Sequence, residues 1–205
     1  MFAATVPALV ALVALYWSYR NNLILAYQDS ASHLLIARRI FDSRTPGLVM
    51  LGTVWLPVPH LLLQPFVVID ALFYSGLAGS CVGFLCFVVT VVMLFLSIRL
   101  IARHELTAWV GLAVFVLNPN VLYLQTTTLT EPVLLMSMTA AGYFLLYWSK
   151  RGSNSSLLMA GLLTTLAVGS RYDGWFFALS AAALISLTVY LRWRDPARTE
   201  GITLA

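Results

Sequence analysis

The chain has 205 residues, of which 60% are hydrophobic and 10% are charged. A soluble domain carries roughly 25% charged residues, so this composition excludes an ordinary soluble protein and predicts one embedded in lipid. The formal net charge of +4 comes mainly from Arg, which polytopic membrane proteins use to fix their orientation. We therefore interpret the charge as a topology signal and predict no nucleic-acid partner.

Six apolar segments predict membrane-spanning helices, because a span needs about 20 mostly apolar residues. In chain order they cover residues 2–19, 76–98, 106–124, 131–148, 156–170 and 175–193. We expect an all-α, polytopic membrane bundle of about six spans that forms a single domain over residues 1–205. Its predicted parts are a first span (1–19), a loop with amphipathic helices (20–75), the remaining spans (76–194) and a cytoplasmic tail (195–205).

Basic residues predict which way the spans run. They follow the second, fourth and sixth spans, as Arg99 and Arg103, Lys150 and Arg151, and Arg192, Arg194 and Arg198. Clusters at alternate ends share one face of the membrane, and the positive-inside rule makes that face cytoplasmic. The polar turns at 118–132 and 170–175 are then expected to face outside.

The segment 56–74 leaves two arrangements open. It is apolar but contains Pro57, Pro59, Pro65 and Asp70. If it spans the membrane, the preceding loop is cytoplasmic, and its four Arg residues obey the positive-inside rule. If it lies at the interface, the loop faces outside. Charge counting favours the first arrangement and the three prolines favour the second.

The polar stretch "AYQDSASHLLIARRI" (26–40) interrupts this apolar chain and predicts a helix that starts near Asp29. A spacing of three to four residues places Asp29 and His33 on one side of that helix. Asp29 either caps the helix or acts as a general base at the boundary between water and lipid. His33 is either structural or tunes the carboxylate and contacts substrate.

A second carboxylate, Glu131, begins the fourth span in "TTTLTEPVLL" (126–135). A carboxylate at a helix start is favoured by the helix dipole, so Glu131 could be a cap and nothing more. The alternative is a continuous polar surface that Glu131 forms with Gln125 and the four Thr residues before it. Such a surface suits a hydroxyl-rich ligand better than lipid.

Two further motifs supply cationic and aromatic candidates. In "GSRYDGW" (169–175), Arg171 either neutralises Asp173 or offers a planar fork to a phosphate. Tyr172 and Trp55 are either aromatic residues of the interfacial belt or stacking partners for a sugar. In "GTVWLPVPHLLLQPF" (52–66), His60 lies in a proline-kinked span or in an interfacial helix that roofs a site.

Together these segments resemble the membrane glycosyltransferases of the GT-C superfamily, which includes the protein O-mannosyltransferases of glycosyltransferase family 39 and the lipid A aminoarabinose transferases. In that superfamily, a first span precedes a long exoplasmic loop with an acidic residue on a juxtamembrane helix, and a Pro-rich segment and a bundle of spans follow. Here "QDSASHLLIARRIFDS" resembles the acidic helix and "GTVWLPVPHLL" the Pro-rich element. The segments "NPNVLYLQTTTLTEPVLL" and "SRYDGW" resemble the later exoplasmic turns.

The resemblance implies an exoplasmic acidic loop, an interfacial segment 56–74 and a multi-pass protein of a prokaryotic plasma membrane whose site faces outside. It also implies inverting transfer of a sugar from a polyprenyl-phosphate donor to a lipid, glycan or protein acceptor. Asp29 would be the general base, and Glu131 would bind the sugar or share the proton. The substrate-binding residues would be His33, Arg38, Arg39, Trp55, His60, Arg171, Tyr172 and Asp173, with Arg171 as the preferred phosphate ligand.

The chain departs from the family pattern in two ways. Many relatives have a paired acidic motif, whereas Asp29 lies between Gln28 and Ser30, so we predict no bridged metal and no cofactor, with a divalent ion as the open alternative. Family members run to several hundred residues, so the resemblance is to the N-terminal catalytic module, and a second chain that completes the bundle is an open option.

Two other function classes compete with the transferase. A transporter or channel subunit would have repeated halves and facing charges in mid-membrane, whereas the acidic residues here cluster at predicted helix ends. A truncated membrane module without catalytic activity is the third interpretation.

Overall fold

In the computed structural model, residues 2–51 and 54–194 are described, and every regular element among them is helical. The elements are α1 (Phe2–Arg20), α2 (Gln28–Asp42), the 3-10 helix η1 (Leu48–Met50), α3 (Pro57–Val67), α4 (Asp70–Ser75), α5 (Leu77–Ala102), α6 (Glu105–Val116), α7 (Pro119–Leu124), α8 (Glu131–Arg151), α9 (Asn154–Ser170) and α10 (Asp173–Arg194). The predicted all-α bundle is therefore confirmed. The predicted tail, residues 195–205 with Arg198, lies outside the described residues.

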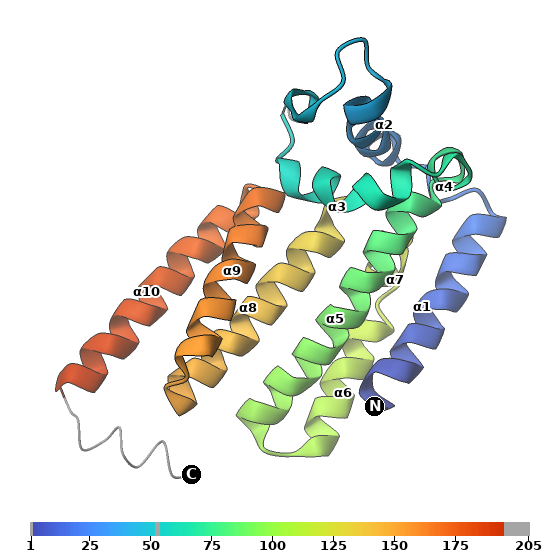
Figure 1. The fold of residues 1–205 in the computed structure, drawn as a ribbon. Coiled ribbons are helices and arrows are strands. Elements are labelled where there is room, and N and C mark those ends of the chain that lie inside the picture. The colour runs from blue at the N-terminus through green and yellow to red at the C-terminus, as the bar shows by residue number, and fades with distance from the viewer. Residues whose placement is uncertain (1, 52–53, 195–205) are drawn as a thin grey trace.

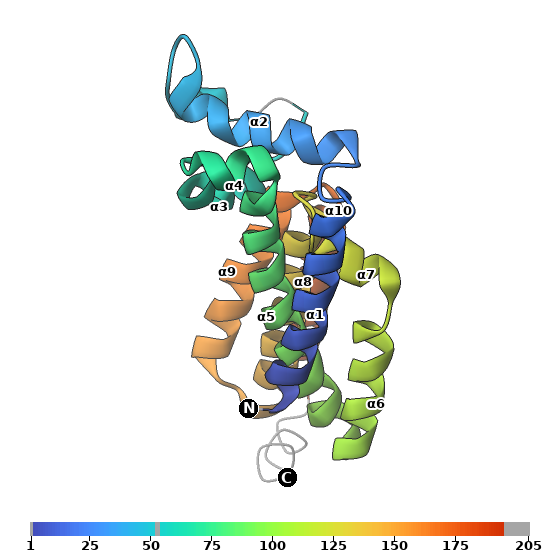
Figure 2. The ribbon, with the colours of Figure 1, turned by 90° about the vertical axis from the view of Figure 1, so that its right-hand side faces the viewer.

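The long helices run side by side along one axis, and α2, α3 and α4 lie across one end of them, which we call the capped end (Figure 1). The view from the side shows the same three helices stacked on that end (Figure 2). The segment 56–74 thus forms two short helices on the bundle instead of a span through it. The basic residues that close α5, α8 and α10 lie at the opposite end, where Lys150 Nζ donates to the carbonyl of Leu100 at 2.7 Å.

The predicted spans map onto α1, α5, α6 with α7, α8, α9 and α10. Among the described residues, α5, α8 and α10 are long and apolar enough to cross a membrane, and α6 and α9 are shorter apolar helices. The predicted span 106–124 is broken after Leu117. Asn118 Oδ1 accepts the backbone N–H groups of Asn120 and Val121 at 2.9 and 3.4 Å and starts a new helix, α7, in which Pro119 is the first residue.

The helix α2 is amphipathic, and its buried face holds it on the bundle. Ser30, His33, Leu34 and Ala37 are buried, a spacing of three and four residues that forms one stripe. A cluster of buried apolar residues joins this stripe to the rest of the capped end, and its members are Leu34, Ala37, Leu63, Val67, Ala78, Val82, Cys86 and Val133. The core therefore fixes the position of α2 and α3 over α5 and α8.

Arg38 provides the polar part of this attachment. Its guanidinium forms ion pairs with Asp42 and with Asp70, the latter at 2.7 Å, and donates to the carbonyl of Val67. It also lies over the ring of Phe73, 5.1 Å from the centroid. One side chain of α2 thereby connects to α3 and α4.

The loop between α7 and α8 is buried against α5. Gln125 and Thr126 to Thr128 are each at most 4% exposed, so the predicted polar surface for a hydroxyl-rich ligand is wrong for these residues. The close approach depends on two glycines of α5. A Cβ at Gly79 would lie 2.2 Å from Thr128 Oγ1, and a Cβ at Gly83 would lie 2.3 Å from the carbonyl oxygen of Gln125.

Replacing Gly83 with Ala is expected to destabilise the bundle by about 1–3 kcal/mol, because the methyl group would overlap backbone that cannot move aside alone. The matched control is Gly142→Ala in the middle of α8, where nothing lies within 4 Å. There the exchange removes the entropic cost of a glycine inside a helix, so it should be neutral or stabilising by up to about 1 kcal/mol. Thermal unfolding of the two purified variants in detergent measures both; equal melting temperatures would contradict the packing described here.

A polar cluster at the capped end

Two buried histidines join α2 to α3. His33 Nδ1 lies 2.9 Å from His60 Nε2, and the side chains are 2% and 0% exposed. The ring of His33 also packs against Trp55, with the ring centroids 4.8 Å apart. One of the two facing nitrogens must carry the hydrogen and the other must accept it, so the contact requires at least one neutral imidazole.

The environment keeps both rings uncharged. The pKa of His33 is lowered to about 4, mainly by burial and also by the nearby His60 and Arg171, while the carboxylate of Asp29 opposes the shift. Burial also lowers the pKa of His60, against a smaller opposing effect of the Leu56 carbonyl. Desolvation is the main cause in each case, because an imidazolium loses its hydration in this position.

Acidification is expected to destabilise the capped end. Because the pKa of His33 is about 4 in the folded chain and 6.5 ordinarily, the unfolded state binds more protons between these values. Stability is therefore fully present above pH 6.5 and falls as the pH drops toward 4, by at most about 3 kcal/mol from this residue. The melting temperature of the purified protein between pH 7.5 and 5 measures the slope.

The variant His33→Asn should flatten that slope, since it removes the group whose protonation is penalised. His104→Gln is the control, because His104 is an exposed residue at the opposite end of the bundle. It should keep the slope of the unmodified chain. A His33→Asn variant with an unchanged slope would show that another group carries the pH dependence.

An ion pair lies beside the histidines, between the start of α8 and the junction of α9 and α10. Arg171 Nη1 donates to Glu131 Oε1 at 2.9 Å and to Thr130 Oγ1 at 3.1 Å, and Nε donates to Asp173 at 3.1 Å. Both partners of the main pair are about one-third exposed. Glu131 Oε2 is buried and makes no hydrogen bond. A buried acceptor that is unpaired costs free energy, so one oxygen of Glu131 has an unused capacity to accept a hydrogen bond.

The histidine pair and the ion pair form one cluster. The charges of Asp29 and Arg171 both act on His33, so α2 lies within electrostatic reach of the α9–α10 junction. A direct link is the hydrogen bond from the Tyr172 hydroxyl to the carbonyl of Val54, at 3.2 Å. We call His33, Trp55, His60, Glu131 and Arg171 the capped-end cluster.

The remaining sequence candidates lie on α2 and at the junction of α9 and α10. Asp29 is exposed in the first turn of α2, with no side-chain partner among the described residues, and Tyr172 and Asp173 are exposed beside Arg171. Arg39 is exposed. Arg38 is already engaged in the contacts that hold α2, and its substrate-binding role stays a prediction.

Sequence reasoning missed two features of the cluster. His33 and His60 are 27 residues apart, and nothing in their separate motifs indicates that they touch. The hydroxyl of Thr130 contacts Arg171, but within the "TTTLTEP" motif nothing distinguishes Thr130 from the other Thr residues as a partner of an arginine. Within the described residues, no group of three or more His, Cys, Asp or Glu side chains is arranged so that it could hold a metal ion.

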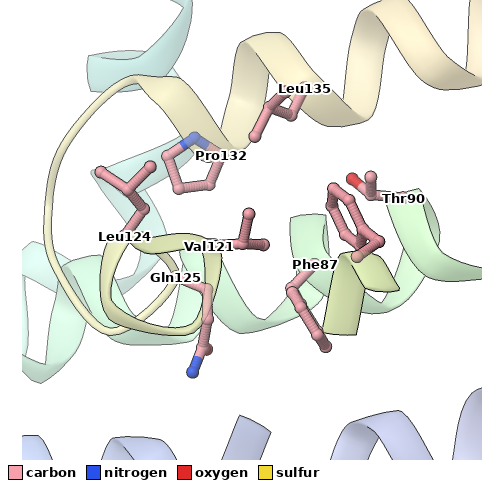
Figure 3. A pocket seen from close by; sticks show the side chains of 8 residues that line it. Phe87, Thr90, Val121, Leu124, Gln125, Pro132 and Leu135 are labelled. Carbon is pink, nitrogen blue, oxygen red and sulfur yellow. The ribbon is translucent and has the colours of Figure 1, made fainter. Parts of the chain in front are cut away.

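The described residues also enclose a small cavity inside the bundle. That cavity has a volume of about 10 Å³ and is lined mainly by apolar side chains of α5, α7 and α8, with Thr90 and Gln125 at its edge (Figure 3). A space of this size holds at most one water molecule.

The fold and the cluster define a class of protein: a helical membrane bundle with a carboxylate, a guanidinium and two imidazoles gathered at the end that short helices cover. A family model for the dolichyl-phosphate-mannose-protein mannosyltransferases matches residues 68–204, and the chain belongs to that family. Membership implies, at the family level, a membrane glycosyltransferase, and it suggests a polyprenyl-phosphate-linked sugar as the donor, in agreement with the resemblance seen in the sequence. No curated protein and no solved structure matches the chain.

Proposed function

We propose that the chain transfers a sugar from a polyprenyl-phosphate donor to an acceptor hydroxyl at the capped end, outside the membrane and with inversion. The observation that carries this proposal is the capped-end cluster itself. It combines an ion pair with an unpaired carboxylate oxygen, next to His33, a residue on which the charges of both Asp29 and Arg171 act. An acceptor base and a cation for a leaving phosphate are the two groups that such a transfer needs.

In this proposal, Asp29 removes the proton from the acceptor hydroxyl as its oxygen attacks the anomeric carbon. The bond between that carbon and the phosphate oxygen breaks, and the polyprenyl phosphate leaves as an anion. Asp29 suits this role because it is exposed at the start of a helix, where an acceptor can approach and where the helix dipole favours the carboxylate. General-base catalysis of this kind contributes roughly 10²–10⁴-fold.

Arg171 stabilises the leaving phosphate. A guanidinium can bind Glu131 with one edge and offer its remaining N–H groups to a phosphate oxygen, and Nη2 of Arg171 has no partner among the described residues. Glu131 holds Arg171 in place and offers Oε2 to a sugar hydroxyl. Trp55 and Tyr172 supply aromatic surface at the edge of the same region.

The test is donor turnover. Membranes that contain the chain are given a polyprenyl-phosphate mannose with a labelled sugar, and the label that leaves the lipid is followed with time. We expect release that depends on the chain and product with inverted anomeric configuration. A donor that stays intact in the presence of the folded chain and a lipid, glycan or protein acceptor mixture would contradict the proposal.

A further inference from the structure

A cavity with polar lining residues lies on the capped end, and none of these residues belongs to the capped-end cluster. Its volume is about 420 Å³, and its lining residues are Tyr19, Arg20, Asn22, Ile24, Leu25, Tyr74 and Ser75. They come from the end of α1, the loop after it and the end of α4. This size is within the range of pockets that bind small ligands.

The cavity has an apolar floor and a polar rim. Ile24 is buried, and a Cβ at Gly76 would lie 2.7 Å from its Cγ2 atom. Gly76 has a φ of +80°, a conformation that glycine adopts readily, so a glycine here permits both the turn from α4 into α5 and the close packing of the floor. The rim contributes a guanidinium, two phenols and the polar side chains of Asn22 and Ser75.

The cation of the rim has no partner within the described chain. Arg20 makes no side-chain hydrogen bond and no ion pair with any described residue. Arg20 is the last residue of α1, where the helix dipole favours a cation. This effect alone could explain why a basic residue stands at this position. That explanation accounts for a basic residue but not for the cavity beside it.

The aromatic residues place the cavity at the membrane interface. Tyr16, Trp17 and Tyr19 near the end of α1 are 64%, 59% and 47% exposed, and Tyr74 of α4 is 75% exposed. Exposed Trp and Tyr at helix ends are typical of the headgroup level of a bilayer. At that level, the anionic group that a guanidinium meets most often is a lipid phosphate.

We propose that this cavity binds the phosphate of an anionic lipid, with Arg20 as its principal ligand, Asn22 and Ser75 as further polar contacts, and Ile24 and Leu25 beneath the glycerol or prenyl carbons. The proposal explains why a basic residue is kept at the end of the bundle opposite to the basic clusters, against the positive-inside tendency. It does not depend on the proposed transferase function, because none of these residues belongs to the capped-end cluster.

The experiment is native mass spectrometry of the purified full chain in detergent, titrated separately with phosphatidylglycerol, phosphatidylcholine and a polyprenyl phosphate. We expect Arg20→Gln to weaken binding of an anionic lipid about fivefold, the effect of one cation near a lipid surface, and to leave phosphatidylcholine unchanged. Arg20→Lys should keep most of the binding. The matched control is Arg44→Gln, an exposed Arg that follows α2 and does not line the cavity.

The lipid whose binding depends on Arg20 identifies the source of the phosphate: phosphatidylglycerol indicates a membrane phospholipid, and the polyprenyl phosphate indicates a lipid of the donor type. Tyr74→Ala provides a second variant that should weaken the same lipid if Arg20→Gln does not fold. The proposal is overturned if neither anionic lipid responds to Arg20→Gln, or if Arg44→Gln has an equal effect.

Discussion

Asp29→Asn is expected to lower sugar transfer by roughly 10²–10⁴-fold, the contribution of a general base, while the melting temperature stays unchanged. Asn has the size of Asp but cannot take up the proton of an acceptor hydroxyl. The side chain is exposed and without a side-chain partner in the described part of the chain, so its loss leaves no packing defect. The rate of label transfer from a polyprenyl-phosphate sugar, at saturating donor, measures the effect.

The matched control is Asp42→Asn at the other end of α2. Asp42 is also an exposed carboxylate of that helix, but it pairs with Arg38, whose contacts with Asp70 and Val67 remain. Because exposed ion pairs contribute about 1 kcal/mol or less, this variant should keep nearly full activity. Equal activity of Asp29→Asn and Asp42→Asn would refute the assignment of Asp29 as the base.

Arg171→Gln is expected to lower kcat by about 10²–10³-fold, as removal of a single group that stabilises developing charge does elsewhere. Its loss would also free Glu131 Oε1, which Arg171 now contacts at 2.9 Å, and place an uncompensated carboxylate beside an anionic phosphate. Arg171→Lys keeps the charge but loses the planar fork, so it should retain an intermediate rate. Single-turnover kinetics with labelled donor separate the chemical step from donor binding.

The double variant Glu131→Gln with Arg171→Gln distinguishes the two roles of Arg171. If Arg171 acts on the phosphate, the double variant stays as slow as Arg171→Gln. If Arg171 serves only to neutralise Glu131, removal of both charges should restore most of the rate. The second result would move Arg171 from the catalytic residues to the positioning residues.

The sequence was sufficient for the class of fold because its signals are local. Apolar segments of known length and alternating basic clusters predict a helical membrane bundle, and the positions of α1, α5, α8, α9 and α10 follow from them. The segment 56–74 could not be placed by the same means, because its apolar composition indicated a span and its prolines did not. Packing decides it: Leu63 and Val67 of α3 are buried against α2 and α5.

The sequence singles out candidate site residues one by one but not their arrangement. Asp29, Glu131 and Arg171 were singled out because ionisable residues are rare in such a chain. Which of them meet depends on how α2, α8 and the α9–α10 junction pack. The polar run before Glu131 illustrates the limit, since Thr128 looked like part of a ligand surface but is 4% exposed, under α5.

The central claim is that Asp29 and the Glu131–Arg171 pair share the outer face of the membrane. Its most direct test uses a chain without Cys81 and Cys86 and single cysteines at Tyr27, Tyr172 and Arg151, all of which are exposed. Intact cells are then labelled with a membrane-impermeant maleimide. We expect labelling at positions 27 and 172 from outside and at position 151 only after the cells are opened. If position 27 labels like position 151, Asp29 lies across the membrane from Arg171, and the proposed site does not exist.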